Sequence, residues 1–137
     1  MRPLPLSVPT AMAVKVVDAS ALAALLFSEP EAEKIAAQLD GAQLAAPALL
    51  GFELANVCLI KSRRHPEQRE ALTSAFRLRD RLQVSNATVD HDGVLELASA
   101  TGLTAYDASY LWLARQLGAE LVTLDKQLAN AEKASRA

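Results

Sequence analysis

The sequence predicts a single α/β domain of three layers, with a central parallel sheet of four to five strands between helices. Short β-branched or apolar runs alternate along the chain with longer helical stretches, which is the order expected of a parallel sheet flanked by helices. The chain has 137 residues, of which 51% are hydrophobic, and this suits one domain with a substantial core. No internal repeat interrupts the alternation.

The first strand and the two helices after it are expected within residues 14–39. The run VKVV (14–17) is short, β-branched and apolar, which is typical of a buried strand. Asp18 is a suitable N-cap for a helix that reaches about Phe27. A second helix is expected over 31–39 and should end at Gly41.

The next part of the chain should add a strand and two long helices. The run AQLAAP (42–47) is a weaker strand, closed by a proline. A long helix is expected over 48–64, because Pro66 marks its end. Residues 67–82 form an amphipathic, arginine-rich pattern that predicts a further helix.

The C-terminal part should contain two more strands and three helices. VSNATVD (84–90) alternates β-branched residues and predicts a strand, after which Asp90 or Asp92 begins a helix that Gly102 ends. The segment 105–117 is nearly all apolar and predicts a buried helix. AELVTLD (119–125) is a good strand, and a short helix follows it.

Composition excludes several classes of function. Cys58 is the single cysteine, so the chain can build neither a disulfide nor a cysteine-based zinc site, which is compatible with a cytoplasmic protein. No apolar run reaches the ~20 residues of a membrane span. The sequence contains no GxxxxGK[ST], GxGxxG or HExxH motif, so it gives no support to a nucleoside-triphosphate site, a dinucleotide site or a zincin. It also contains no GxSxG nucleophile motif. Residues 1–12, interrupted by three prolines, are expected to form a flexible extension, and Met12 is a second candidate for the first residue.

Charge is unevenly distributed. The net charge is −2, but residues 61–81 contain seven basic and three acidic residues, a balance of +4 that leaves −6 for the rest. Such a basic segment indicates either an anionic partner or an ordinary solvated helix face.

Acidic residues occur at positions where a parallel sheet binds its ligands. Asp18 and Asp125 directly follow predicted strands, and ligands of open α/β sheets bind beyond the carboxyl ends of the strands. Each could instead serve only as the N-cap of the next helix. Asp107 lies one turn into a nearly apolar helix, where a capping box with Thr104 is the structural alternative. Glu53 has apolar helical neighbours, although it could also face water at the edge of its helix.

If the four carboxylates Asp18, Glu53, Asp107 and Asp125 converge, they repel one another and destabilise the fold. A divalent cation would reverse that effect, and ligation by oxygen alone favours Mg²⁺ or Mn²⁺ over zinc.

The stretches VVDASALAALLFSEPEA, APALLGFELANV and LTAYDASYLWLARQLGAELVTLDKQLA resemble the PIN-domain family, and most closely its small VapC-type members, the ribonuclease toxins of bacterial toxin–antitoxin pairs. The resemblance runs from about Val14 to Leu128. It implies a metal-dependent endoribonuclease with an RNA substrate, a cognate antitoxin, a homodimeric state and a cytoplasmic location. It also implies that the four acids are the catalytic and Mg²⁺-binding residues, and that Ser20 and Thr123 hold those carboxylates by hydrogen bonds.

The acidic pocket would repel RNA, so we expect the basic segment 61–81 to supply affinity, with Arg77, Arg79 and Arg81 as candidate RNA-binding residues. The same region could instead receive the antitoxin through its apolar residues. Three alternatives stay open: a PIN nuclease of RNA processing outside any toxin system, a non-catalytic PIN-like module that binds RNA or a protein, and a phosphatase or phosphotransferase. The phosphatase is disfavoured because Ser20 stands where a second acid is usual.

Overall fold

The structure, a computed structural model, describes residues 12–136. Its centre is a sheet of four parallel strands in the order β3-β2-β1-β4. The strands are β1 (Val14–Val17), β2 (Gln43–Pro47), β3 (Val84–Ala87) and β4 (Glu120–Val122). The predicted three-layer α/β class is confirmed. The predicted flexible extension, residues 1–12, lies outside the described residues except for its last position.

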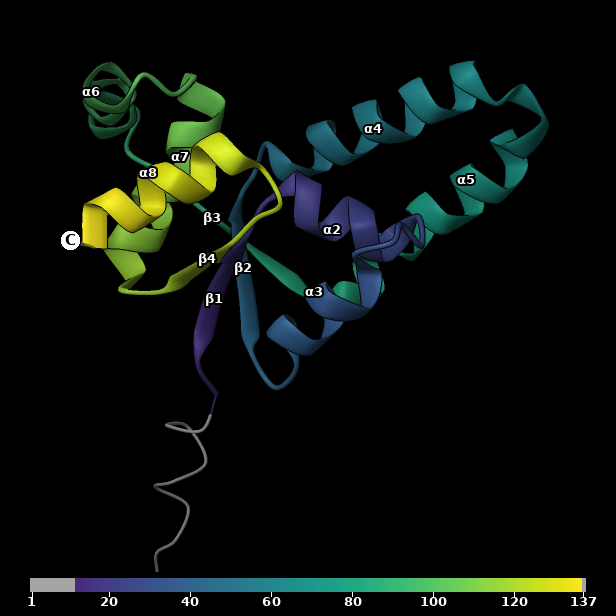
Figure 1. Ribbon diagram of the computed structural model, residues 1–137, viewed down its shortest axis with the longest axis horizontal. Helices are drawn as coiled ribbons and strands as arrows, with labels where there is room; N and C mark the ends of the chain where they lie inside the picture. Colours follow the sequence, from purple (N-terminus) through teal and green to yellow (C-terminus); the bar gives the residue numbers. More distant parts are fainter. Residues whose placement is uncertain (1–11, 137) are drawn as a thin grey trace, which may run out of the picture.

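Helices cover both faces of this sheet. The α-helices are α2 (Ala19–Leu26), α3 (Ala32–Leu39), α4 (Leu50–Arg64), α5 (Arg69–Arg77), α6 (His91–Thr101), α7 (Ala105–Leu117) and α8 (Lys126–Arg136). In Figure 1, α6, α7 and α8 lie on one side of the sheet, while α2, α3 and the first turns of α4 lie on the other. Because both faces are covered, Val16 and Val17, which point to opposite faces of β1, are both fully buried.

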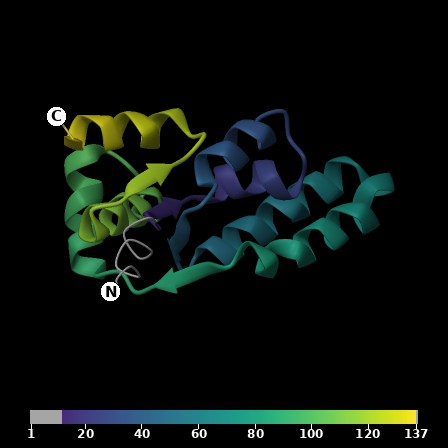
Figure 2. The ribbon, with the colours of Figure 1, turned by 90° about the horizontal axis from the view of Figure 1, so that it is seen from below.

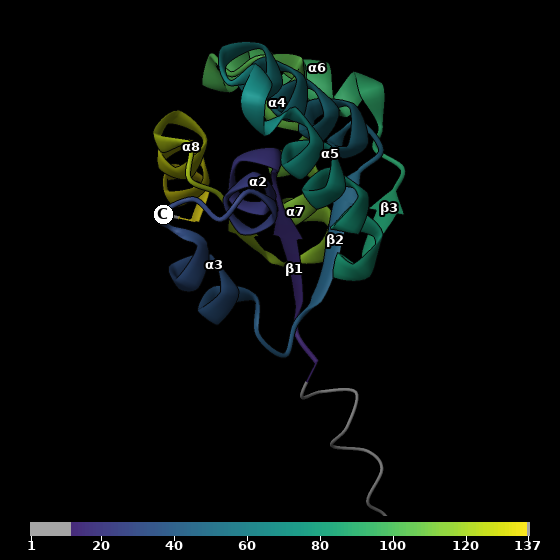
Figure 3. The same ribbon diagram turned by 90° about the vertical axis from the view of Figure 1, so that its right-hand side faces the viewer.

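The helices α4 and α5 form an antiparallel hairpin that projects from the body of the molecule, as Figures 2 and 3 show from two further directions. Leu50, Leu54 and Cys58 are the buried residues of α4, and their spacing of four places them in one stripe of the helix. The helix is otherwise mostly exposed. Its apolar content gave no indication that most of its surface has no neighbouring layer.

The predicted continuous helix over 67–82 is also wrong. The segment begins with a 3₁₀ turn, η2 (Pro66–Gln68), continues as α5, and tightens into a second 3₁₀ turn, η3 (Leu78–Leu82). The Phe76 carbonyl, near the end of α5, accepts a hydrogen bond from the Arg79 guanidinium at 3.2 Å. Gln83 then adopts a left-handed conformation with φ of 54°, which turns the chain into β3.

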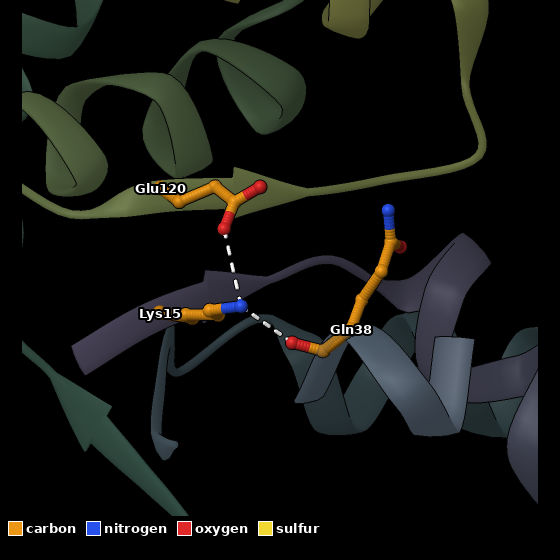
Figure 4. A network of polar contacts seen from close by, with 3 residues as sticks. All are labelled: Lys15, Gln38 and Glu120. Atoms are coloured by element: carbon orange, nitrogen blue, oxygen red, sulfur yellow. Dashed lines mark hydrogen bonds and ion pairs between the residues drawn. The ribbon is translucent and has the colours of Figure 1, made fainter. Parts of the chain in front are cut away.

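Polar contacts fix the amino-terminal edge of the sheet (Figure 4). The Lys15 ammonium on β1 lies 3.2 Å from the Glu120 carboxylate on β4 and donates to the backbone carbonyl of Gln38 near the end of α3 at 2.5 Å. Lys15 thus joins two strands and a helix at the edge opposite to the one where the acids were predicted. Among residues 12–136, no helix is both long and apolar enough to cross a bilayer.

Candidate metal centre

All four predicted acids lie in segments at the carboxyl edge of the sheet. Asp18 comes directly after β1, and Asp125 lies three residues beyond the end of the neighbouring β4. Glu53 is in the first turn of α4, the helix after β2, and Asp107 is in the first turn of α7. Four segments that are distant in sequence therefore bring carboxylates to one region.

Asp18 is the most firmly held of the four. Its carboxylate is 5% exposed and accepts hydrogen bonds on both oxygens. Oδ1 accepts from Ser20 Oγ at 2.7 Å and from the Ala21 amide at 3.0 Å, and Oδ2 accepts from Thr123 Oγ1 at 2.6 Å. Burial raises the pKa of Asp18, these hydrogen bonds oppose the rise, and the charge of Asp125 adds to it. Asp18 is thus the N-cap of α2 while its carboxylate stays oriented at the sheet edge.

The hydroxyl groups of Ser20 and Thr123 join the ends of β1 and β4. Ser20 Oγ accepts from the Leu124 amide at 2.9 Å, and Thr123 Oγ1 accepts from the Asp125 amide at 2.9 Å. Each hydroxyl therefore donates to Asp18 and accepts from the backbone that leads to Asp125. Together the two hydroxyl groups fix the backbone at Asp125 relative to the side chain of Asp18.

Glu53 has a partner that the sequence analysis missed. The hydroxyl of Tyr110, on α7, donates to Glu53 Oε1 at 2.6 Å, and Tyr110 is only 1% exposed. Burial raises the pKa of Glu53, the hydrogen bond opposes this, and the charges of Asp107 and Asp18 raise it further. Sequence reasoning counted Tyr110 as one more apolar residue. A buried tyrosine usually needs a polar partner, which was the available signal.

Asp107 and Asp125 occupy the starts of two helices. Thr104 Oγ1 caps α7 by accepting from the Asp107 amide at 3.1 Å, while Asp125 Oδ1 accepts from the Leu128 amide at 2.9 Å at the start of α8. The pKa of Asp107 is raised first by burial and then by the charges of Asp125 and Asp18. The capping interpretations are thus compatible with a second role for these carboxylates at the sheet edge.

The chemistry of this group fits a hard divalent cation. It offers carboxylate and hydroxyl oxygens only. Burial first, and then the charges of neighbouring carboxylates, raise the pKa of Asp18, Glu53 and Asp107, and a cation would relieve that repulsion. As the side chains stand, no three His, Cys, Asp or Glu residues in 12–136 are grouped closely enough to hold a metal ion. A bound ion would therefore have to draw the carboxylate oxygens closer together.

The predicted RNA-binding arginines differ from one another in their surroundings. Arg77 and Arg81 are exposed, at the end of α5 and in η3. Arg79 is partly buried, and its guanidinium lies 4.0 Å from the centre of the Phe76 ring and donates to the Phe76 carbonyl. Two of the three side chains are therefore free to reach a solvent-borne phosphate, and Arg79 is engaged within the hairpin.

The nearly apolar α7 is less buried than its sequence suggested. Ala108, Tyr110 and Leu111 are buried, as expected, but Tyr106 in its first turn is 66% exposed. Six of the thirteen residues of α7 are buried, and its last turn, from Arg115 to Leu117, is exposed as well. The prediction of a helix buried on every side was therefore correct for the middle of the helix and wrong at both ends.

Comparisons with known proteins agree with this architecture. A sequence model of the PIN domain matches residues 15–134. The chain is 35% identical over 119 residues to Ribonuclease VapC3 of Pyrobaculum aerophilum, a match that covers 83% of this chain and 91% of that protein. The crystal structure of PAE2754 from Pyrobaculum aerophilum superimposes with a TM-score of 0.71 at 28% identity, covering 89% of this chain and 88% of that one.

Proposed function

The chain belongs to the PIN-domain family, and from that premise we propose that it is a metal-dependent endoribonuclease, the toxin of a toxin–antitoxin pair, that hydrolyses RNA phosphodiester bonds. The observation that supports this most is the gathering of four carboxylates from four segments at one sheet edge, with Asp18 fixed by three hydrogen bonds. The similarity to a protein named as a ribonuclease supports the choice of RNA.

The proposed roles follow from the contacts of each acid. Asp18, Asp107 and Asp125 would hold one or two Mg²⁺ ions, with Mn²⁺ as a possible substitute. A cation bound there would supply charge neutralisation for the substrate phosphate and a lowered pKa for the attacking water. Glu53 would orient that water or bind through a water, because Tyr110 already donates to Oε1 and leaves Oε2 for a second contact.

Ser20 and Thr123 would act by holding Asp18 rather than by touching the substrate. Their hydroxyls donate to different oxygens of its carboxylate, which leaves Asp18 little freedom to rotate. Substrate affinity would come from the exposed cations of the basic segment 61–81, chiefly Arg77 and Arg81, because the acids themselves repel phosphate.

The remaining parts of the proposal rest on the family alone. We infer a cognate antitoxin protein, a homodimeric state and a cytoplasmic location, in keeping with the similarity to Ribonuclease VapC3. A PIN nuclease of RNA processing would share the same chemistry and differ only in its partners.

The test is cleavage of a fluorescently labelled RNA in Mg²⁺ by the wild type and by the variants Asp18→Asn and Asp107→Asn. Both variants should lose cleavage while circular dichroism shows an unchanged fold. Asp40→Asn is the matched control, because Asp40 is an exposed acid after α3 and outside the group, and it should cleave normally. Cleavage at the wild-type rate by either site variant would contradict the proposal.

A further inference from the structure

Two exposed aromatic side chains flank the candidate metal centre. The chain has three Phe, two Tyr and one Trp, all within the described residues. Of these six, only Phe52 and Tyr106 are exposed, at 83% and 66% of their surface. A single exposed ring is common on protein surfaces, so the significance of these two lies in their position next to the acids.

Each exposed ring directly precedes one of the acids. Phe52 comes before Glu53 in the first turn of α4, and Tyr106 comes before Asp107 in the first turn of α7. Each ring is thus attached to the helix one residue from its acid, and the two side chains of each pair leave the helix about 100° apart. The hydrogen bond from Tyr110 to Glu53 joins α4 to α7 within one turn of both rings. The two aromatics therefore belong to the same region as the acids.

We propose that Phe52 and Tyr106 stack on unpaired nucleobases of the RNA next to the phosphate that is cut, so that the substrate is a single-stranded segment. This rests on the proposed nuclease function. A phosphate held at the carboxylates brings its neighbouring bases to the surroundings of these acids. Aromatic rings on rigid helices are the usual platforms for unstacked bases.

The surroundings of the rings favour a base over a protein partner. A protein interface usually buries a continuous apolar patch, whereas these rings stand next to charged Glu53 and Asp107. The other neighbours in sequence, Gly51 and Ala105, are small and exposed. A Cβ added at Gly51 would meet no atom within 4 Å, so space is open beside Phe52. A flat base can occupy such space while its phosphate remains at the carboxylates.

The experiment compares cleavage of a single-stranded RNA with cleavage of the same sequence in a duplex, after the wild-type cut site has been mapped. The variants are Phe52→Ala and Tyr106→Ala, with Phe52→Leu and Tyr106→Leu to keep apolar bulk without a flat ring. Leu117→Ala is the control, because Leu117 is 47% exposed and lies eleven residues along α7, about 16 Å from Tyr106 along the helix axis.

The wild type should prefer the single strand. Each Ala and Leu variant should raise KM for it by about 5- to 150-fold, the usual effect of losing one base–aromatic stack, with a smaller change in kcat. Substrates with an abasic site at each nucleotide beside the cut provide the specific readout. If a given ring stacks on one base, the substrate that lacks this base should be cut equally well by the wild type and by the variant that lacks this ring.

The outcomes separate this inference from the proposed function. A wild type that cuts no RNA in Mg²⁺ or Mn²⁺ would overturn both. A wild type that cuts duplex and single strand equally, or ring variants with unchanged KM, would overturn the stacking role alone. Unchanged KM together with a changed oligomeric state in light scattering would assign the rings to contact with a second copy of the chain.

Discussion

Tyr110→Phe removes one hydroxyl from the molecule and leaves the aromatic ring in place. That hydroxyl donates to Glu53 Oε1 at 2.6 Å and connects α7 to the first turn of α4. The ring itself is 1% exposed and packs in the core, so the substitution changes the hydrogen bond without opening a cavity. The perturbation therefore isolates the contact that orients Glu53.

The size of the effect follows from the burial of the two partners. A hydrogen bond to a charged group contributes about 1.5–3 kcal/mol. Because Glu53 is only half-buried, water can replace part of the lost contact, and we expect a loss of about 1–2 kcal/mol in the free energy of unfolding. For a chain of 137 residues this corresponds to a fall in Tm of about 3–7 °C.

The assay is thermal and urea unfolding at pH 7 of a double-mutant cycle made of Tyr110→Phe, Glu53→Ala and the double variant. The coupling energy should be about 1–2 kcal/mol, because both single changes remove the same contact. Cleavage by Tyr110→Phe should also slow, since Glu53 would no longer be held. A coupling energy below about 0.3 kcal/mol, the scatter of independent sites, would refute the assignment of this hydrogen bond.

Three further predictions concern packing, charge and pH. Gly93→Ala should destabilise the fold by about 1–3 kcal/mol in urea unfolding, because the added Cβ would lie 2.5 Å from Trp112 Nε1 between α6 and α7; equal stability would contradict the close packing. Replacing Arg77 and Arg81 with Ala should weaken RNA binding and reduce the slope of log affinity against log salt by up to about 1.4, at ~0.7 per lost phosphate contact; an unchanged slope would remove both from the RNA surface. The raised pKa values of the buried acids mean that the folded state binds protons more tightly than the unfolded chain, whose carboxyls titrate near 3.8 and 4.5. In EDTA, stability should therefore fall as pH rises through and above that range; a rise over the same interval, once metal is excluded, would contradict the raised pKa values of these acids, which burial and neighbouring charges cause.

The sequence was sufficient for the fold class because its patterns are local and the sheet is buried on both faces. The run VKVV is typical of an inner strand. Asp18 follows it and Asp125 follows LVTL, and residues in these positions lie at the carboxyl edge of any parallel sheet. Three helix starts were equally predictable, since Asp18, Asp90 and Thr104 each cap their helix with a side-chain oxygen.

What the sequence could not supply is the identity of the neighbours across space. Apolar periodicity in α4 predicts a helix, but whether another layer covers it depends on where the chain turns at Pro66 and returns through η3. The same limit hid the exposure of Tyr106 and the partner of Glu53. Tyr110 lies 57 residues from Glu53 in the chain, and only the packing of α7 near the start of α4 joins them.

The most direct test of the central claim is the binding of Mn²⁺, followed by electron paramagnetic resonance and by calorimetry on the full chain. The wild type should bind one or two ions and gain thermal stability from them, while Asp18→Asn and Asp107→Asn should bind at least tenfold more weakly, a loss of about 1.4 kcal/mol or more. Failure of the wild type to bind Mn²⁺, or equal binding by both variants, would contradict a cation site built from these carboxylates.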